Sequence, residues 1–332
     1  MSLANAASST GQPSIPDVMT GVQLVGHGGF EKLHYRTDIP VPSPGPGEVL
    51  IRVAAAGINN TDINTRIGWY SKAVQEATGE GGSKGFDGAE ADDATWSGIP
   101  MSFPRIQGID CCGHIVSVGD GVDPSRIGQR VIVRNMLRTY VDYRPGEHWA
   151  LGSECDGAFA QYVKAPSRET HAVDCNWSDV ELASVPCSYS TAEGMLHRSS
   201  VKSGEHVLIT GASGGVGSAA VQLAKRRGAF VTAVAGKAKG QEILDLGADR
   251  VIERGQNLVR NIGKASVDVV VDVAAGPTFP ELLEVLRWSG RYVVAGAIAG
   301  PIVELDVRTL YLKDLTFFGS TLYDEVVFDN LV

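Results

Sequence analysis

One segment, residues 206–217, restricts the fold of this chain more than any other feature of its sequence. The apolar run HVLIT is followed by the glycine-rich sequence GASGGVG, and residues 215–227 have helical character. A buried strand that turns through glycines into a helix directs backbone N–H groups and the positive end of the helix dipole at one point. The segment therefore predicts a loop that binds the pyrophosphate of a dinucleotide.

The glycine-rich loop departs from the strict G-x-G-x-x-G pattern. Ala212 stands where the first glycine is expected, so that Ala212-x-Gly214-x-x-Gly217 fills the pattern instead. Glycines also occur in purely structural turns, and GASGG matches the G-x-S-x-G nucleophile turn of hydrolases. The strand–loop–helix context and the units that follow favour dinucleotide binding over both alternatives. The loop residues expected to contact the cofactor are Gly211, Ser213, Gly214, Gly215 and Val216.

Strands and helices alternate after the loop. Apolar strands separated by helices indicate a parallel sheet covered on both faces, with right-handed crossovers. The fold class is therefore α/β, with a doubly wound parallel-sheet Rossmann domain expected over residues 189–320. The predicted strands are Phe230–Val234, Arg250–Ile252, Val267–Val273 and Gly290–Ala295, and the predicted helices are Lys239–Leu246 and Glu281–Trp288.

The first half of the chain has a different pattern. Short apolar runs bounded by Gly, Pro and Asp predict closely spaced strands, and hence a barrel-like domain over residues 18–188. Within it, residues 71–98 are glycine-rich and acidic without a hydrophobic period, which predicts a long mobile loop. A lid over a substrate cleft and a tolerated surface insertion both fit this composition. The predicted strands are Gly47–Val53, Cys112–Val118 and Gln129–Val133.

The composition argues against several classes of function. The formal net charge is −9 and no Lys/Arg cluster is present, so neither nucleic acid nor a membrane surface is expected as a partner. The five cysteines are odd in number and no signal peptide is recognisable, which indicates reduced thiols in a cytoplasmic protein. Residues 1–17 are mostly small and polar and predict a disordered leader.

The end of the second Rossmann strand indicates which dinucleotide binds. An NAD-specific site usually carries Asp or Glu there, which accepts hydrogen bonds from the ribose hydroxyls. This chain has Gly236 followed by Lys237 and Lys239, and ammonium groups attract the 2′-phosphate that a carboxylate would repel. We expect NADPH as the cofactor, with Gly236 and Lys237 in its site. The alternative is that the lysines merely solvate the start of a helix.

Further motifs occur in order along the chain: AAAGINNTD from Ala54, RIGWY from Arg66, QGIDCCG from Gln107, GQRV from Gly128, GAFAQYV from Gly157, VKSG from Val201 and LTFFGST from Leu315. Together with the glycine-rich loop they resemble the medium-chain dehydrogenase/reductase superfamily, nearest to its zinc-independent quinone oxidoreductase branch. The resemblance implies a GroES-like β-barrel substrate domain before the Rossmann domain, with catalysis in the cleft between them. It also implies a small-molecule substrate and a homodimer or homotetramer.

The resemblance implies that no metal ion is bound. Asn59 and Ile109 stand where metal-dependent members carry a cysteine and a histidine ligand, and only Cys187 matches a ligand position. Ile has no lone pair, and an amide is a poor zinc ligand. The four-cysteine structural lobe is absent too, since nothing between Val131 and Glu154 is a cysteine. We expect Cys187 to be a small buried thiol beside the cofactor.

Without a Lewis acid, hydrogen bonds must polarise the substrate while nicotinamide C4 delivers hydride. The resemblance implies that Asn59 orients the substrate and that Tyr70 donates a hydrogen bond or forms a wall of the nicotinamide site. Thr61 matches a proton-relay hydroxyl of the zinc enzymes. Asp62 is a catalytic candidate, although a structural carboxylate that fixes the turn is the favoured interpretation.

The resemblance also implies contacts of the cofactor outside the glycine-rich loop. Arg254 stands where relatives place a side chain on the adenosine, so it either stacks on adenine, pairs with the 2′-phosphate or is a solvated surface residue. Thr191, Ala274 and Ala297 are expected to line the same site. Residues 321–332 are expected to begin a return to the substrate domain and to stop where its helix should start, which leaves that domain without its closing piece.

The sequence thus predicts an oxidoreductase that carries out NADPH-dependent, zinc-independent reduction of a quinone, an enone or a small carbonyl compound. Two alternatives stay open. One is a zinc-dependent alcohol dehydrogenase with an atypical metal site, and the other is a non-catalytic protein that binds NADPH.

Overall fold

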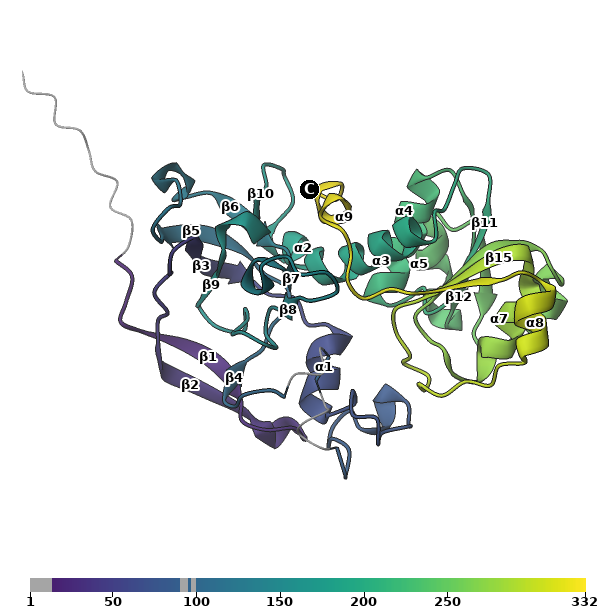
Figure 1. Cartoon of the computed structure of the whole chain (residues 1–332), viewed down its shortest axis with the longest axis horizontal. Helices are drawn as coiled ribbons and strands as arrows, with labels where there is room; N and C mark the ends of the chain where they lie inside the picture. The colour runs from purple at the N-terminus through teal and green to yellow at the C-terminus, as the bar shows by residue number, and fades with distance from the viewer. Residues whose placement is uncertain (1–13, 90–94, 97–99) are drawn as a thin grey trace, which may run out of the picture.

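The N-terminal half of the chain is a GroES-like β domain in the computed structural model, which describes residues 14–89, 95–96 and 100–332 (Figure 1). Within these ranges, an antiparallel sheet has the order β10-β6-β5-β3-β9, and beside it lie the sheet β2-β1-β4 and the ribbon β7-β8. The elements are β1 Val18–Leu24, β2 Leu33–Pro40, β3 Glu48–Ala55, α1 Asn60–Ile67, β4 Arg105–Ile106, β5 Cys112–Val118, β6 Arg130–Val133, β7 Met136–Leu137, β8 Trp149–Ala150, β9 Tyr162–Pro166, β10 Thr170–Ala172 and α2 Asp179–Ala183.

Strand β3 contributes to the core of this domain mainly through its first half. Val49 and Ile51 are fully buried with Ile115 of β5, and Leu50 between them is buried as well. From Arg52 onward, exposed and half-buried side chains alternate, which is the pattern of a strand that is solvated on one face.

The second half is a Rossmann domain whose sheet, within residues 206–319, has six parallel strands in the order β13-β12-β11-β14-β15-β16. Alternate residues of β11 face opposite helices: Val207 and Ile209 pack with α3 and α4, and Leu208 packs with α7. The sheet is therefore covered on both faces. The elements are α3 Pro186–Arg198, β11 His206–Ile209, α4 Gly215–Arg226, β12 Phe230–Ala235, α5 Gly240–Asp245, β13 Arg250–Glu253, α6 Leu258–Ile262, β14 Val267–Asp272, α7 Phe279–Val285, β15 Leu286–Val294, α8 Val307–Leu312, β16 Thr316–Gly319 and α9 Glu325–Asp329.

One predicted element of this half is wrong at its end. The helix expected over Glu281–Trp288 begins at Phe279 and ends at Val285, and β15 begins at Leu286. Leu286 is buried and pairs with Val267 of β14, whereas Trp288 projects into solvent. Because Leu and Trp suit both a helix and a strand, only the pairing with β14 decides where the helix stops.

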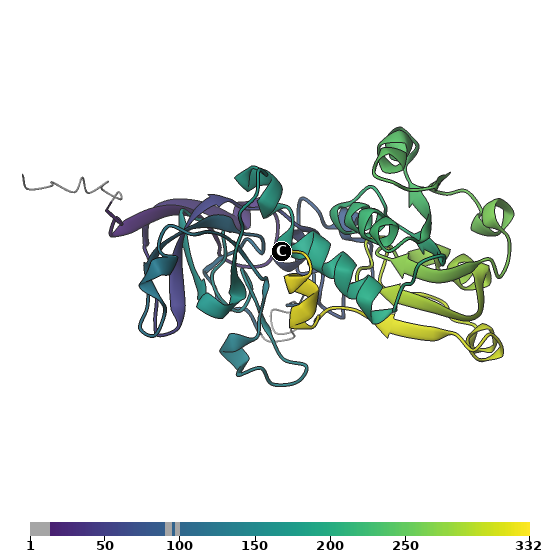
Figure 2. The same cartoon turned by 90° about the horizontal axis from the view of Figure 1, so that it is seen from above.

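The chain passes between the two domains more than once. Helix α3 lies between them, and the boundary predicted at residues 188–189 falls within it. After β16 the chain runs back along α3, and α9 lies over the N-terminal domain in both views (Figures 1 and 2). There, Val327 and Phe328 are buried with Ile132 and Met136 of the first domain, and the Tyr323 hydroxyl donates a 2.6 Å hydrogen bond to Asn135 Oδ1.

The described part of the 71–98 segment is anchored to the first domain. The Arg66 guanidinium donates to the carbonyl oxygens of Gly28 (2.9 Å) and Gly82 (2.7 Å), and the Phe86 N–H donates to the Ile67 carbonyl oxygen (3.1 Å). The Trp96 ring contacts the His148 ring at a centroid distance of 5.7 Å. Residues 90–94 and 97–99 of this segment, and residues 1–13 of the expected leader, lie outside the described residues.

All five cysteines lie in the described ranges, and each is a free thiol. Among the residues that the structure describes, no helix is long and apolar enough to cross a membrane.

Candidate active site

The glycine-rich loop joins β11 to α4, and two of its glycines are required by close packing. A Cβ on Gly217 would lie 2.2 Å from the Gly211 carbonyl oxygen, so only glycine lets α4 approach the strand end this closely. Gly211 has a φ of 56°, and a Cβ there would lie 2.7 Å from a Val273 methyl group. Ala212 is fully buried in the core under α4, which explains why a methyl group is accepted at this position of the pattern.

The start of α4 is open to an anion. Ser213, Gly214 and Gly215 are exposed, and no side chain caps the helix N-terminus at Gly214. Val216 is half-buried. A twelve-residue helix with an uncapped, glycine-rich start presents free N–H groups to a phosphate.

A positively charged corner lies beyond the ends of β12 and β13. A Cβ built on Gly236 would lie 3.8 Å from an Arg254 Nη atom, and Lys237 follows directly. Lys239 forms a 2.9 Å ion pair with Glu242. Among the described residues, the side chains of Lys237 and Arg254 form no ion pair, although both are exposed. Two uncommitted cations therefore flank a position that has no side chain.

The ends of β14 and β15 carry Ala274 and Ala297. The buried carboxylate of Asp272 accepts hydrogen bonds from the backbone N–H groups of Ala274 (2.9 Å) and Ala275 (3.1 Å), and from the Thr210 hydroxyl. It thereby fixes the turn after β14 next to the end of β11. Apart from Thr191, which lies on α3, the predicted cofactor residues of the Rossmann domain thus follow the carboxyl ends of parallel strands, on one edge of the sheet.

The candidate catalytic residues of the first domain gather around α1. Asn59 is the N-cap of this helix, and its backbone N–H donates to Asp62 Oδ2 (2.9 Å) in a capping box. The half-buried Tyr70 hydroxyl donates to Thr61 Oγ1 (3.2 Å). Burial raises the pKa of Tyr70 to about 12, so the phenol stays protonated at neutral pH. The structure therefore brings Asn59, Thr61, Asp62 and Tyr70 together.

Asp62 has a structural role. Its Oδ1 also accepts the backbone N–H groups of Gly108 (3.2 Å) and Ile109 (3.3 Å), which joins α1 to the strand segment before β5. Burial raises the pKa of Asp62 to about 6. Both oxygens thus accept backbone N–H groups, an arrangement that suits a structural carboxyl group better than a catalytic one.

We expect Asp62→Ala to lower the free energy of unfolding by about 3 kcal/mol, because three backbone N–H groups, two of them buried, lose their acceptor. Since the folded-state pKa lies above the ordinary value, the stability due to Asp62 declines as the pH rises from about 4 to about 6. Urea titrations should therefore show a larger deficit at pH 4.5 than at pH 7.5. Asp123→Ala, which removes an exposed turn cap, should cost under about 1 kcal/mol; equal effects of the two changes would contradict this role.

Sequence reasoning missed Asp110, a fully buried carboxyl group at the centre of the site. Its Oδ1 accepts the Cys187 backbone N–H (2.6 Å) and its Oδ2 accepts from Asn59 Nδ2. A Cβ on Gly57 would lie 2.9 Å from Asp110 Oδ2, so that glycine makes room for the carboxyl group. Burial raises the pKa of Asp110 to about 8.

Ser188 connects Asn59, at the start of α1, to the glycine-rich loop. Its hydroxyl donates to Asn59 Oδ1 (3.1 Å), and a Cβ on Gly215 would lie 2.5 Å from the same hydroxyl oxygen. Ser188 and Thr191 both lie on α3. The substrate-domain residues and the phosphate-binding loop therefore meet at the first turn of α3.

The three positions that hold catalytic zinc in metal-dependent enzymes do not suit the metal here. Ile109 is buried and has no donor atom, and the Asn59 amide is already bonded to Asp110 and Ser188. Burial raises the pKa of the Cys187 thiol, which disfavours the thiolate that zinc requires. Within the described ranges, no three His, Cys, Asp or Glu side chains are grouped to hold a metal ion.

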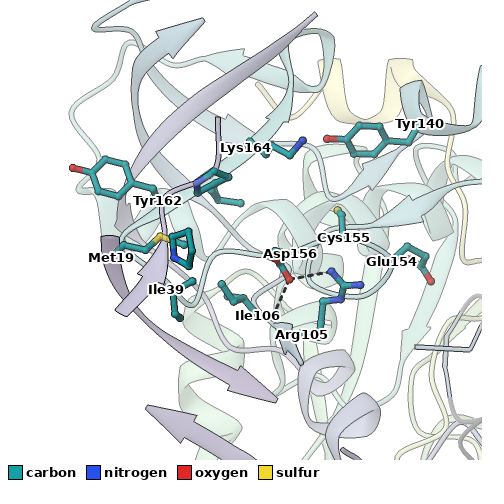
Figure 3. Close-up of a pocket in the computed structure, with 13 residues that line it drawn as sticks. Met19, Ile39, Arg105, Ile106, Tyr140, Glu154, Cys155, Asp156, Tyr162 and Lys164 are labelled. Carbon is teal, nitrogen blue, oxygen red and sulfur yellow. Dashed lines mark hydrogen bonds and ion pairs between the residues drawn. The ribbon is translucent and has the colours of Figure 1, made fainter. Parts of the chain in front are cut away.

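A separate pocket of about 270 Å³ lies in the first domain (Figure 3). Met19, Ile39 and Ile106 line one side, and Arg105 pairs with Asp156 at 3.0 Å on the other. None of the predicted site residues lines this pocket, so it is not the candidate active site.

Comparisons with known proteins show the family of this chain. The family model described as alcohol dehydrogenase GroES-like domain matches residues 45–174, and the model described as zinc-binding dehydrogenase matches residues 215–332. Quinone oxidoreductase of Homo sapiens is 28% identical over 92% of this chain and 81% of its own length. Acryloyl-coenzyme A reductase of Metallosphaera sedula is 32% identical over 85% of this chain and 79% of its own length.

Among solved structures, a putative alcohol dehydrogenase from Sinorhizobium meliloti 1021 is 44% identical, with a TM-score of 0.85, and the match covers 96% of this chain and 86% of that one. The fold and the relatives define an oxidoreductase that uses a nicotinamide cofactor and acts on small molecules. The chain belongs to the medium-chain dehydrogenase/reductase superfamily, which confirms the resemblance seen in the sequence.

Proposed function

We propose that this oxidoreductase uses NADPH to reduce a quinone, an enone or a small carbonyl compound, and that it does so without zinc. The observation that carries the proposal is the charged corner beside Gly236. Lys237 and Arg254 are free of acidic partners among the described residues, and the lack of a side chain at Gly236 leaves room between them. Two cations beside an open position suit the 2′-phosphate of NADPH, and a guanidinium also stacks on adenine.

The zinc-independent part of the proposal is supported by the donor atoms at Asn59, Ile109 and Cys187. One thiol with a raised pKa, one committed amide and one hydrocarbon side chain make a poor ligand set for zinc. Polarisation of the substrate then has to come from hydrogen-bond donors.

The substrate class is supported by the relatives that are named quinone oxidoreductase and acryloyl-coenzyme A reductase. A quinone and an acryloyl group share one chemical feature, a C=C bond conjugated to a carbonyl group. Hydride addition to either one builds negative charge on the carbonyl oxygen. Donors directed at that oxygen are the groups that accelerate such a step most.

The residues around α1 supply such donors. Bound NADPH delivers hydride from nicotinamide C4. Thr61 accepts the Tyr70 hydroxyl, which leaves the hydroxyl hydrogen of Thr61 for the substrate oxygen. The raised pKa of Tyr70 keeps the phenol protonated, so this arrangement persists at neutral pH. Asn59 orients the substrate beside them, and Asp62 holds α1 in place.

Incubation of the purified protein with NADPH and a panel of quinones, enals and small ketones tests the proposal. We expect loss of NADPH absorbance with at least one substrate, at least about tenfold slower turnover with NADH at equal low concentration, and no effect of a chelator. Failure to oxidise NADPH with any member of the panel would count against the proposal.

The second candidate is a zinc-dependent alcohol dehydrogenase with an atypical site, favoured by the family description zinc-binding dehydrogenase. It requires stoichiometric zinc in elemental analysis and loss of activity on chelation. A non-catalytic role for bound NADPH instead requires tight binding without turnover, and indifference to Tyr70→Phe.

We also propose that the chain forms a homodimer or a homotetramer through the sheet edge at β16. Beyond β16 no further strand pairs with the sheet among the described residues, and the neighbouring helix α8 exposes Val307, Tyr311 and Leu312. An unpaired strand edge beside exposed apolar side chains is a usual site of association between copies.

A further inference from the structure

The Asn59 side chain has two partners that together fix which of its ends faces which way. Asn59 Nδ2 donates to Asp110 Oδ2, and Asn59 Oδ1 accepts from the Ser188 hydroxyl. An amide has two N–H hydrogens and two acceptor lone pairs. The bond to Asp110 uses one of the two N–H hydrogens and therefore leaves the other N–H of Asn59 uncommitted.

The Asp110 carboxyl group is held in place by contacts at both of its oxygens. It is fully buried, and its other oxygen accepts the Cys187 backbone N–H at the first turn of α3. The backbone at Gly57 packs against the carboxyl group, where a Cβ would come within 2.9 Å of Oδ2. Neither oxygen can move without breaking a buried contact, so the direction of the bond to Asn59 is fixed as well.

The position of Asp110 is costly for stability, which argues that the group has a use. Among the described residues no Lys, Arg or His forms an ion pair with it, and a buried carboxyl group without a cation destabilises a fold. Asp62, Cys111 and Cys187 are the titratable neighbours, and each bears no charge or a negative one. If packing alone were needed, an apolar residue at this position would destabilise the fold less than a buried carboxyl group does.

We propose that Asp110 is a positioning residue that turns the free N–H of Asn59 toward the substrate carbonyl oxygen. The inference rests on the proposed function and adds a residue to it. Because an amide nitrogen and oxygen are nearly equal in shape, packing alone would let the Asn59 side chain rotate by half a turn. Ser188 does not prevent this rotation, since a hydroxyl can donate or accept. Once ionised, Asp110 can only accept, so the carboxylate form selects the orientation. Because burial raises the pKa of Asp110 to about 8, this selection is complete only at a pH above about 8.

Rotation of the Asn59 amide would reverse its effect on the substrate. Its carbonyl oxygen would then face the oxygen on which negative charge develops during hydride transfer. A donor would be replaced by a repulsive acceptor, and removal of a single donor of this kind lowers kcat by about 100-fold in other enzymes. The binding of NADPH, which depends on the loop after β11, should not change.

The test compares Asp110→Asn with the exchange variant Asn59→Asp/Asp110→Asn. In the single variant two amides face each other and either orientation of Asn59 can form a hydrogen bond. In the exchange variant the amide placed at position 110 can accept from the Cys187 N–H and donate to the carboxylate placed at position 59. The buried hydrogen bonds are thus restored, but an acceptor now faces the substrate.

At pH 9, where Asp110 is mostly ionised, we expect Asp110→Asn to lower kcat by about 10- to 100-fold with little change in the NADPH Kd. The exchange variant should recover most of any lost thermal stability and yet lower kcat further. Asp123→Asn, the same chemical change at an exposed turn, should leave kcat, Kd and Tm unchanged.

Either of two results would overturn the inference. One is a wild-type kcat in Asp110→Asn. The other is recovery of both kcat and thermal stability in the exchange variant, which would show that Asp110 has a purely structural role. Failure of the proposed function is a different result, because the wild-type protein would then reduce no quinone, enone or ketone, and the inference would fall with the proposed function.

Discussion

Gly236→Asp is expected to reverse the coenzyme preference of the enzyme. A carboxylate at this position would repel the 2′-phosphate, and it would also pair with Arg254, whose Nη atom lies 3.8 Å from the site of the new Cβ. Loss of a charge-assisted contact of roughly 1.5–3 kcal/mol, together with repulsion, should weaken NADPH binding by about 100-fold or more. The same carboxylate can accept hydrogen bonds from the ribose hydroxyls, so NADH binding should improve.

Lys239→Ala is the matched control for Gly236→Asp, because both substitutions make the net charge more negative by one unit. Lys239 is already paired with Glu242. Its removal should change the NADPH Kd less than about threefold in a buffer of physiological ionic strength. Fluorescence titration with NADPH and with NADH measures two dissociation constants for each variant. Equal weakening by the two substitutions would mean that general electrostatics, and not the corner beside Gly236, sets the preference.

Gly217→Ala is expected to displace α4 and thereby disrupt the coenzyme site. The new Cβ would lie 2.2 Å from the Gly211 carbonyl oxygen and 2.7 Å from both the Gly211 carbonyl carbon and the Ala212 Cα. All three are backbone atoms, so no side chain can move aside. Relief requires α4 to move away from the end of β11. Such overpacking destabilises by about 1–3 kcal/mol or more, and the displaced helix should bind either coenzyme at least about 100-fold more weakly.

Gly214→Ala separates this packing effect from the effect on the ligand. The Cβ added there would meet only the Gly211 carbonyl oxygen at 3.5 Å, an ordinary contact, and it would project toward the exposed start of α4. We expect unchanged Tm of the coenzyme-free protein but weaker binding of NADPH, because the methyl group obstructs the approach of the pyrophosphate. Thermal unfolding with and without NADPH distinguishes the two variants. Equal loss of Tm in both would contradict the different roles assigned to these glycines.

The Rossmann half of the site could be predicted because its information is local in sequence. A run such as Val267–Asp272 is buried on both faces and reads as a strand from its residues alone, and the predicted range ended only one residue later. In a parallel sheet the residue after each strand necessarily lies on the same edge. Gly236 could therefore be assigned to the cofactor site from its position behind an apolar run, whereas Arg254 and Ala274 were expected there from the family resemblance.

The half of the site that lies in the N-terminal domain depends on contacts between segments that are distant in the sequence, and no local pattern reveals such contacts. The bond from Asn59 to Asp110 spans 51 residues of chain, and the bond from Ser188 to Asn59 spans 129. One signal was present, namely an acidic residue flanked by Ile109 and Cys111 in an otherwise apolar stretch. A carboxyl group in such a place must be buried and hydrogen-bonded, and this could have singled out Asp110.

The return of the chain to its first domain has a consequence for biosynthesis. The hydrophobic core around Ile132 and Met136 includes Val327 and Phe328, which are translated almost two hundred codons later. The strands of the Rossmann sheet, by contrast, follow one another without interruption from residue 206 to residue 319. During synthesis the coenzyme-binding domain can therefore complete its sheet before α9 has left the ribosome and covered Ile132 and Met136 of the N-terminal domain.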